Sequence, residues 1–217
     1  MEKKIILIYG AGGIARDIVD FFEPSDNYEI QGFIDDNKKE NKINGLEVYT
    51  LQEAKVKYKQ GFYTVIAIGD PQIKQKILNK IKDINEIKLT NIISNKAFIF
   101  PSCTLGLGNI IYPFSIVASN TKIVDNVLIC GNCSIGHDAF IGNFSTISFN
   151  STIGGNTKIG KAVFIGSGSH IRDEIEIKDR CTIGMGSKVL KSVEKDKIYY
   201  NKLVDYLTHN KLEGIFK

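Results

Sequence analysis

Hydrophobic positions in the C-terminal half of the chain recur with a period of six residues. Every sixth residue from position 99 to position 189 is Ile, Leu or Val. These residues are Ile99, Leu105, Ile111, Val117, Ile123, Ile129, Ile135, Ile141, Ile147, Ile153, Ile159, Ile165, Ile171, Ile177, Ile183 and Val189. The register never slips, so no long loop interrupts the series. Such regularity indicates a structural repeat, which has to be assigned before any other element.

Two further positions of the six-residue unit are restricted. The residue after the aliphatic one is often Gly, as at Gly136 and Gly154, and the fourth residue after it is usually small, as at Ser145. A chain that turns a tight corner after each short strand needs an inward aliphatic side chain on each face, a small one near the corner, and Gly where the backbone bends or is approached closely. Three faces make a triangular coil of about eighteen residues, and coils stack about 4.8 Å apart. Residues 97–190 therefore predict about five coils.

The first ninety or so residues follow a different pattern, in which short apolar runs alternate with helical segments. Strands are predicted at 4–9, 29–34, 62–68 and 87–93, and helices at 16–23, 51–59 and 72–81. This alternation predicts a small Rossmann-like α/β domain, about half the length of a full dinucleotide-binding domain. We assign 1–95 to this domain, 96–192 to the all-β coils, and 193–217 to a C-terminal capping segment. Leu203, Leu207 and Leu212 have helical spacing there, which predicts a short helix.

Composition and charge exclude several classes of protein. The chain has 217 residues, of which 43% are hydrophobic and 24% charged, as in ordinary folded proteins. The net charge of +4 comes from scattered lysines that form no basic stripe, so we expect no nucleic-acid partner. The apolar run Ile5–Tyr9 is too short for a signal peptide or a membrane span. We therefore expect a cytoplasmic protein without membrane insertion.

Glycine and acidic residues lie at the predicted carboxyl ends of three strands, where open α/β sheets bind their ligands. The glycine turn lets backbone amides approach a phosphate oxygen at the positive end of the following helix, and the acids can accept hydroxyl groups of a ribose or hold a base edge. These residues are Gly10, Gly12, Gly13, Asp35, Asp36, Gly69 and Asp70. The alternatives are a strand-to-helix turn without a ligand and, for the acids, a solvated turn.

Cys130 and Cys133 have the C-x-x-C spacing of redox pairs and of half a zinc site. The six-residue register already accounts for both, because Cys133 fills a small inward position and Cys130 follows the inward Ile129. No second close pair exists in the sequence. We therefore expect no metal site, and thiols rather than disulfides in a reducing compartment.

Several segments taken together resemble a known family. Tyr9–Gly13, Gly32–Asp36 and Ala67–Asp70, joined to hexapeptide repeats that carry Gly136-His137-Asp138, are similar to the bacterial nucleotide-sugar acetyltransferases of the NeuD-like and PglD-type family. The resemblance covers residues 4–192. It implies a left-handed parallel β-helix, a handedness that the periodicity alone does not supply. It also implies a homotrimer with active sites between adjacent β-helices, acetyl-CoA along the coils, and a nucleotide sugar on the N-terminal domain.

The same resemblance implies roles for individual residues. His137 matches the general base of the family, and Asp138 the acidic neighbour that raises its basicity. A neutral imidazole, with an ordinary pKa of about 6.5, is suited to accept the proton that an amine or hydroxyl loses as it attacks a thioester. The alternative for His137 is a solvent-facing corner residue. The positions matched for acetyl-CoA are Thr146, Gly155, Ser167, Met185 and Gly186, and Ile14 joins the glycines and acids named above at the nucleotide sugar.

This chain departs from the family pattern at three places. Ile14 stands where many relatives carry His, Thr146 where some have a second His that contacts acetyl-CoA, and Tyr199–Leu203 replaces the usual Gly-x-Pro-Ala-Lys close. The resemblance implies acetyl-CoA-dependent N-acetylation of a nucleotide-linked 4-amino-4,6-dideoxy sugar in bacterial glycan synthesis. O-acetylation of a sugar of the sialic-acid type is the enzymatic alternative. A non-catalytic β-helix, acting as a scaffold or only binding a nucleotide sugar, is the alternative of another class.

Overall fold

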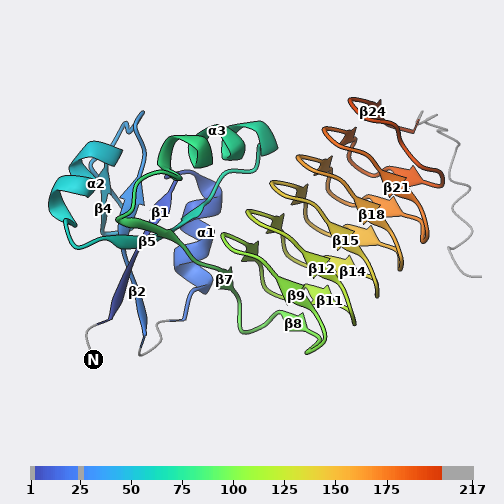
Figure 1. The fold of residues 1–217 in the computed structure, drawn as a ribbon, viewed down its shortest axis with the longest axis horizontal. Helices are drawn as coiled ribbons and strands as arrows, with labels where there is room; N and C mark the ends of the chain where they lie inside the picture. Colours follow the sequence, from blue (N-terminus) through green and yellow to red (C-terminus); the bar gives the residue numbers. More distant parts are fainter. Residues whose placement is uncertain (1–2, 24–26, 202–217) are drawn as a thin grey trace, which may run out of the picture.

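The alternating pattern of the N-terminal segment folds as a six-stranded sheet with helices on both faces (Figure 1). The computed structural model describes residues 3–23 and 27–201. The strand order is β3-β4-β2-β1-β5-β6, and only the β3–β4 hairpin is antiparallel. The strands are β1 (Lys4–Tyr9), β2 (Tyr28–Ile34), β3 (Lys42–Ile43), β4 (Leu46–Tyr49), β5 (Phe62–Ile66) and β6 (Ile87–Leu89). The helices are α1 (Gly13–Phe21), α2 (Leu51–Lys57) and α3 (Pro71–Ile81).

Alternate residues of the central strand β1 pack against different helices, as the two-residue period of a strand requires. Ile6 and Ile8 belong to one core cluster with Ala15 and Ile18 of α1. Leu7 belongs to a second cluster, which contains side chains of α2 and α3. Helix α1 therefore covers one face of the sheet, and α2 and α3 cover the other.

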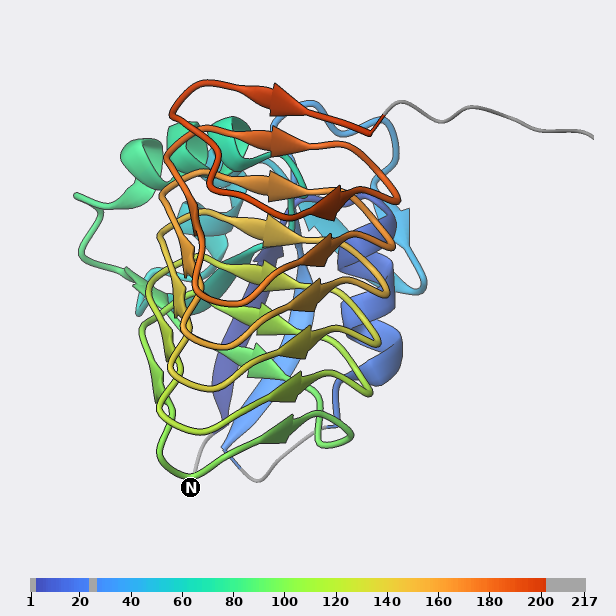
Figure 2. The same ribbon diagram turned by 90° about the vertical axis from the view of Figure 1, so that its right-hand side faces the viewer.

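The six-residue repeat folds as a left-handed parallel β-helix, in which each coil adds one two-residue strand to each of three flat faces (Figure 2). The first face contains β7 (Ile92–Ile93), β10 (Ile110–Ile111), β13 (Leu128–Ile129), β16 (Thr146–Ile147), β19 (Phe164–Ile165), β22 (Thr182–Ile183) and β24 (Ile198–Tyr199). The second face contains β8 (Phe98–Ile99), β11 (Ile116–Val117), β14 (Ser134–Ile135), β17 (Thr152–Ile153), β20 (His170–Ile171) and β23 (Lys188–Val189). The third face contains β9 (Thr104–Leu105), β12 (Lys122–Ile123), β15 (Phe140–Ile141), β18 (Lys158–Ile159) and β21 (Glu176–Ile177).

The inward aliphatic residues form the core of the β-helix. Ile111 pairs with Ile129, and Ile129 pairs with Ile147, so identical positions of successive coils lie directly above one another. The aliphatic residues from Ile111 to Val189 are at most 3% exposed and belong to one continuous cluster. The pattern of the sequence thus becomes a column of stacked Ile side chains on each face.

The corners of the coils explain the glycines and reveal a second requirement. A Cβ on Gly136 would come within 2.5 Å of the Gly155 nitrogen, and one on Gly154 within 2.3 Å of the Asp173 nitrogen, so Gly stands where the next coil approaches most closely. Three residues after many of the inward aliphatic residues, the backbone has a positive φ. Asn and Asp tolerate this conformation better than other residues with a side chain, and they often occupy the position. Examples are Asn120, Asn126, Asn132, Asp138, Asn150 and Asn156.

Two sequence predictions of secondary structure need correction, and one hairpin was not predicted. The segment 87–93 is not one strand: β6 ends at Leu89, and Ile92–Ile93 begins the first face of the β-helix by pairing with β10. Ile198–Tyr199, expected in the C-terminal segment, forms β24 on β22, because its alternation fits another rung. The β3–β4 hairpin was not expected, since its strands are very short and join at Asn44 and Gly45, both with positive φ. The expected helix around Leu203, Leu207 and Leu212 lies outside the described residues.

The N-terminal domain packs on the first face of the β-helix. Ile110, Tyr112, Leu128 and Cys130 of that face and its edge belong to the same buried cluster as Ile18 of α1. The Tyr112 hydroxyl also lies 3.3 Å from both the Ile14 carbonyl oxygen and an Asp17 carboxylate oxygen. The junction is therefore a shared apolar core with polar contacts at its margin. Among the described residues, no side chain of the second or third face belongs to this shared buried cluster.

Candidate functional site

His137 lies at the corner between the second and third faces, between β14 and β15. It follows the glycine that allows close stacking of the coils, and the left-handed residue Asp138 comes next, with a φ of 56°. The side chain of His137 is 62% exposed and that of Asp138 is 45% exposed. The corner therefore presents an imidazole and a carboxylate to the outside of the prism.

The two side chains form an oriented pair. His137 Nδ1 lies 2.8 Å from Asp138 Oδ2, and Asp138 Oδ1 accepts a hydrogen bond of 3.1 Å from the Asn120 amide. The bonds from His137 and from Asn120 hold the pKa of Asp138 below its usual value. An ionised carboxylate can only accept hydrogen bonds, so Nδ1 must carry the proton. In the neutral ring, Nε2 is then left with a free lone pair.

Gly155 lies directly above this pair in the next coil. A Cβ at Gly155 would come within 2.8 Å of His137 Nε2, so the imidazole occupies space that a side chain at 155 would take. The Asn156 amide also donates to the His137 carbonyl oxygen at 2.8 Å. The structure thus brings together His137 and Asp138, matched to the catalytic pair, and Gly155, matched to acetyl-CoA.

The other positions matched for acetyl-CoA lie elsewhere. Ser167, Met185 and Gly186 stack at the corner between the first and second faces, where the Gly186 amide donates to the Ser167 carbonyl oxygen and Met185 is 79% exposed. Thr146 is 1% exposed, and its hydroxyl donates to the Gly69 carbonyl oxygen at 2.8 Å. The expectation that Thr146 contacts acetyl-CoA does not fit this placement, because the outward side chains of β16 are covered by the N-terminal domain.

The predicted loops of the N-terminal domain meet at the carboxyl ends of β2, β1 and β5. A pocket of about 480 Å³ opens there, with walls formed by Gly10, Asp35, Asp36, Ile68 and residues of α3. A second pocket of about 270 Å³ adjoins Gly12, Arg16 and the other side of Asp35. Gly12 and Gly13 are exposed, and a Cβ on either would meet no atom within 4 Å, so the start of α1 is open to a ligand.

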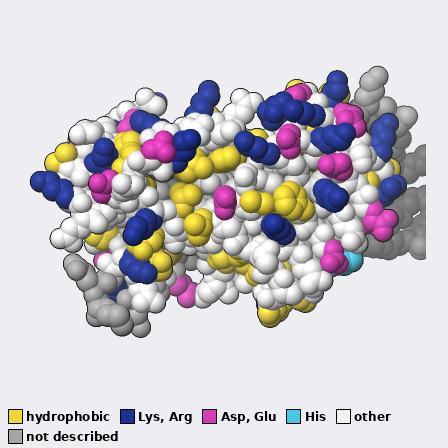
Figure 3. Space-filling view, viewed as in Figure 1, with side chains coloured by type: hydrophobic (Ala, Val, Ile, Leu, Met, Phe, Trp, Pro, Cys, Tyr) yellow, Lys and Arg dark blue, Asp and Glu magenta, His cyan; other side chains and the backbone are white. Residues whose placement is uncertain are grey.

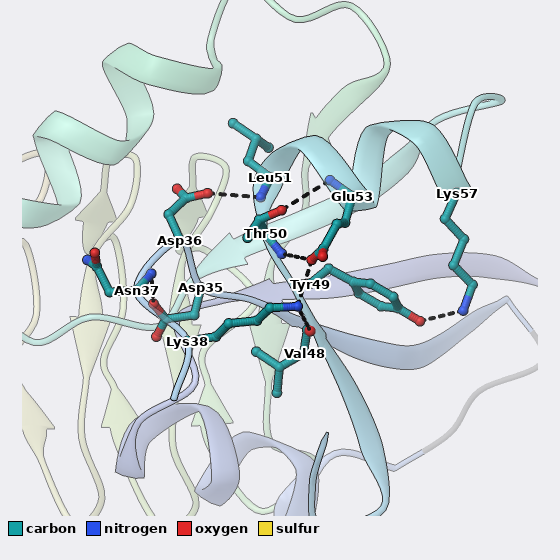
Figure 4. Close-up of polar contacts among 10 residues, drawn as sticks. All are labelled: Asp35, Asp36, Asn37, Lys38, Val48, Tyr49, Thr50, Leu51, Glu53 and Lys57. Atoms are coloured by element: carbon teal, nitrogen blue, oxygen red, sulfur yellow. Dashed lines mark hydrogen bonds and ion pairs between the residues drawn. The ribbon is translucent and has the colours of Figure 1, made fainter. Parts of the chain in front are cut away.

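Asp35 and Asp36 differ sharply in their surroundings (Figure 4). Asp36 accepts hydrogen bonds from the Tyr9 hydroxyl at 2.6 Å, Lys80 Nζ at 2.6 Å and the Leu51 amide at 2.9 Å. Burial raises the pKa of Asp36, but these bonds outweigh burial and keep the pKa below its usual value. Asp35 accepts only the Asn37 amide among the described contacts, and it lines both pockets. Asp35 is therefore the acid with room for a ligand, and Asp36 organises the turn.

Asp70, like Asp36, is held by hydrogen bonds to neighbouring residues. Its carboxylate accepts from the amides of Gln72 at 2.8 Å and Ile73 at 3.0 Å, which caps the N-terminus of α3. Ile14 reaches across to the neighbouring loop, since a Cβ on Gly69 would lie 3.4 Å from its Cδ1. The glycine turn and the Gly69–Asp70 loop are thus in contact through an apolar side chain.

Sequence reasoning did not select the lysines of α3. Lys76 and Lys80 line the pocket of about 480 Å³, and Lys80 forms an ion pair with Asp36. A signal was available, because residues four apart on a helix share one face and α3 begins directly after the Gly69–Asp70 loop. The pocket consequently holds two cations beside the open acid Asp35.

One chain does not bring the two groups of residues together. The N-terminal loops belong to the domain that packs on the first face, whereas His137 stands at the edge between the second and third faces (Figures 1 and 2). A reaction that uses both groups needs either a long ligand or a second chain.

Exposed apolar side chains gather on the N-terminal coils of the second face and at its edges. Phe98 is 59% exposed, Phe114 64% and Ile116 46%, and Phe100 lies beside Phe98 with ring centroids 5.2 Å apart. In the later coils of the same face the outward residues are polar, namely Ser134, Thr152, His170 and Lys188. In the space-filling view, hydrophobic patches alternate with interspersed basic and acidic side chains on the side shown (Figure 3).

Within the described residues, no group of three or more His, Cys, Asp or Glu side chains could hold a metal ion. All four cysteines are free thiols, and burial raises the pKa of Cys130 to about 12 and that of Cys133 to about 11. In the parts of the chain that the structure describes, no helix is long and apolar enough to cross a bilayer.

Comparison with known proteins identifies both domains. Residues 5–81 match the family described as PglD N-terminal domain, and residues 156–191 match the bacterial transferase hexapeptide family of six repeats. A curated relative, "Uncharacterized protein L142" of Acanthamoeba polyphaga mimivirus, is 32% identical over 116 residues, which cover 53% of this chain and 22% of that protein. The match therefore spans about a fifth of the relative's length.

Solved structures share the whole fold. PerB from Caulobacter crescentus, in complex with CoA and GDP-perosamine, is 23% identical, with a TM-score of 0.76 over 89% of this chain and 90% of that chain. The acetyltransferase domain of PglB from Neisseria gonorrhoeae, in complex with acetyl coenzyme A, is 24% identical, with a TM-score of 0.81 over 90% and 94%. WeeI from Acinetobacter baumannii is 24% identical, with a TM-score of 0.79 over 88% and 93%. Residues 5–81 therefore belong to the PglD N-terminal domain family and residues 156–191 to the transferase hexapeptide family, the two parts that the resemblance to the NeuD/PglD-like family joins.

Proposed function

We propose that this chain is an acetyl-CoA-dependent acetyltransferase that acts on a nucleotide-linked 4-amino-4,6-dideoxy sugar, with His137 as general base. The observation that carries the proposal is the exposed His137–Asp138 pair, in which the His137 Nε2 lies against Gly155 and forms no hydrogen bond with the described residues. The pocket beside Asp35, Lys76 and Lys80 in a PglD N-terminal domain supports a nucleotide sugar as the second substrate. Similar folds in PerB and PglB have been solved with CoA or acetyl coenzyme A.

The chemistry that this corner supports is a direct transfer. The amine nitrogen of the sugar attacks the thioester carbonyl of acetyl-CoA, the nitrogen–carbon bond forms, and the carbon–sulfur bond breaks. His137 Nε2 accepts the proton that the amine loses, and the CoA thiolate takes up a proton to leave as the thiol. Asp138 holds the Nδ1 proton and stabilises the imidazolium while it exists.

One assay separates the three interpretations of the sequence. The protein is mixed with acetyl-CoA, a thiol reagent, and a panel of UDP-, dTDP- and GDP-linked 4-amino-4,6-dideoxy sugars, with sialic acid and hydroxyl-only nucleotide sugars in parallel. Thiol release with the aminosugars alone supports N-acetylation. Release with hydroxyl acceptors alone would indicate O-acetylation instead. No release with any acceptor would favour a scaffold or a binding protein.

The proposal includes a homotrimer in which one copy supplies His137 and a neighbour supplies the nucleotide-sugar pocket. The separation of the two groups within one chain supports it, as does the apolar surface of Phe98, Phe114 and Ile116 beside the polar coils of the second face. Ile116→Glu should dissociate the trimer in sedimentation velocity and abolish turnover, whereas Val56→Glu, at an exposed apolar residue of α2, should do neither. Mixed trimers of His137→Ala and Asp35→Ala subunits should recover part of the activity. No recovery would mean that each chain works alone.

A further inference from the structure

Lys74 is a buried lysine at the junction of the two domains. It lies in the first turns of α3, directly after the Gly69–Asp70 loop, and is 1% exposed. Its Nζ donates to the Asn126 carbonyl oxygen at 3.1 Å, the Ser145 carbonyl oxygen at 3.0 Å and the Thr146 hydroxyl at 2.9 Å. All three acceptors belong to the β-helix. They use the three donors of an ammonium group, so the contact is complete and directional.

No carboxylate pairs with this ammonium group among the described residues. Burial lowers the pKa of Lys74 to about 7, although Asp70 nearby opposes the shift. An unpaired buried cation costs stability that an apolar residue of similar length would not. The three hydrogen bonds of Lys74, which join the two domains, must offset this cost in stability.

Thr146 extends the contact to the loop itself. Its hydroxyl accepts from Lys74 and donates to the Gly69 carbonyl oxygen at 2.8 Å. The segment 69–74 is therefore tied to β16 at both ends, at its first carbonyl through Thr146 and at its helical end through Lys74. Asp70 joins the two ends by capping α3.

This tied segment forms a wall of two pockets. Ile68 and Ile73 border the pocket of about 480 Å³ that contains Asp35. Gly69, Asp70 and Gln72 border a further pocket of about 500 Å³ between the domains, whose other wall includes Phe164 and Thr182 of the first face. A shift of the segment against the β-helix would change the shape of both pockets.

The geometry points to Lys74 and Thr146 as positioning residues that fix the Gly69–Asp70 loop on the β-helix and so keep the nucleotide-sugar pocket in its binding shape. This role rests on the proposed function. Neither side chain touches the reacting atoms, because both are buried behind the loop. Their removal should therefore weaken the binding of the nucleotide sugar and spare the binding of acetyl-CoA.

The experiment compares Lys74→Met and Thr146→Val with Lys82→Met. Lys82 is exposed at the other end of α3. Its replacement by Met is therefore the same substitution at a position that forms no hydrogen bond with the described residues of the β-helix. Calorimetric titration with UDP, dTDP and GDP should give a Kd about tenfold higher in the first two variants, and unchanged in the third. In the acetyl-transfer assay, KM for the sugar nucleotide should rise while kcat and KM for acetyl-CoA stay within about twofold. Equal weakening of both substrates, or none in folded variants, would overturn the assignment.

Amide hydrogen exchange provides a readout that does not depend on the proposed function. The amides of residues 69–74 should exchange several-fold faster in Lys74→Met and Thr146→Val than in Lys82→Met, while those of β1 keep their protection. If the wild-type protein transfers no acetyl group and binds none of the three nucleotides, the proposed function fails, and this comparison still decides whether the loop is fixed. Unchanged exchange over residues 69–74 would refute the positioning role even in an active enzyme.

Discussion

The exposed corner at His137 and the buried junction at Lys74 each hold a titratable nitrogen against oxygen acceptors, but they hold it differently. His137 is 62% exposed, has one carboxylate partner, and leaves its second ring nitrogen without a partner among the described residues. Lys74 is 1% exposed, has three neutral acceptors, and has no donor to spare. The first arrangement allows a proton to be exchanged with a ligand. The second uses its donors to hold two domains together.

The difference teaches where chemistry can occur in this fold. A β-helix is rigid because each inward position is filled by a side chain from every coil, so new chemistry is confined to the corners and outward positions. At a corner, a left-handed residue such as Asp138 can fold its carboxylate back on its neighbour. On a covered face, the same strand register places Thr146 against the other domain. The same repeat therefore provides both the exposed corner at His137 and the domain contact at Thr146.

Loss of the imidazole should produce the largest effect. His137→Ala should lower kcat by about 10²- to 10⁴-fold, because it removes the proton acceptor of the transition state. Acetyl-CoA affinity, measured by calorimetry, should change little. Asp138→Asn keeps the ring but replaces the ionised acceptor of the Nδ1 proton, so its loss of kcat should be smaller. A normal rate in His137→Ala would mean that the proton goes to another group.

The buried junction should instead reveal itself in stability. Folding lowers the pKa of Lys74 from 10.5 to about 7. Below pH 7 both states bind the proton, and between about pH 7 and 10.5 the unfolded chain binds a proton that the folded chain does not. Stability therefore rises with pH over this interval. Relative to Lys74→Met, the wild-type free energy of unfolding should increase by about 3 kcal/mol from pH 6.5 to 9.5.

Denaturant unfolding at several pH values, at one protein concentration, measures this difference. Lys82→Met should follow the wild-type pH dependence throughout. Parallel curves for wild type and Lys74→Met would show that Lys74 keeps an ordinary pKa, and the contrast between corner and junction would then lose its electrostatic basis.

The same contrast explains what the sequence could predict. The aliphatic period predicted the coils residue by residue, because each inward position repeats the same packing problem. The same period explains why His137 and Gly155 lie at one corner, since they are eighteen residues apart. The Lys74–Thr146 contact could not be predicted, because it joins residues 72 positions apart through a domain packing that no periodicity encodes. The resemblance matched Thr146 to acetyl-CoA, and its burial under the N-terminal domain could not be foreseen for the same reason. Asp36 likewise could not be distinguished from Asp35.

A methyl group placed beside His137 should test the role of the exposed corner without removing any functional group. Gly155→Ala would place a methyl group 2.8 Å from His137 Nε2, so the imidazole must move. Because the obstacle is the end of a side chain, the fold should tolerate the change, and kcat should fall about 10- to 100-fold at an unchanged Tm. Gly131→Ala, whose Cβ would meet only ordinary contacts, is the matched control. Full activity in Gly155→Ala would show that the ring position is not critical.

The smallest effects should separate the two acids of the N-terminal pocket. Asp35→Ala should raise the Kd for UDP, dTDP or GDP about tenfold at an unchanged Tm, since Asp35 lines the pocket with few internal bonds. Asp36→Ala removes the acceptor of Tyr9, Lys80 and the Leu51 amide, so it should lower the free energy of unfolding by about 1–2 kcal/mol. Calorimetry and denaturant unfolding on both variants give four values. If Asp36→Ala weakens nucleotide binding at full stability while Asp35→Ala does not, Asp36 is the acid that binds the ligand. Hydrogen bonds to neighbouring residues would then not distinguish a structural acid from a ligand-binding one.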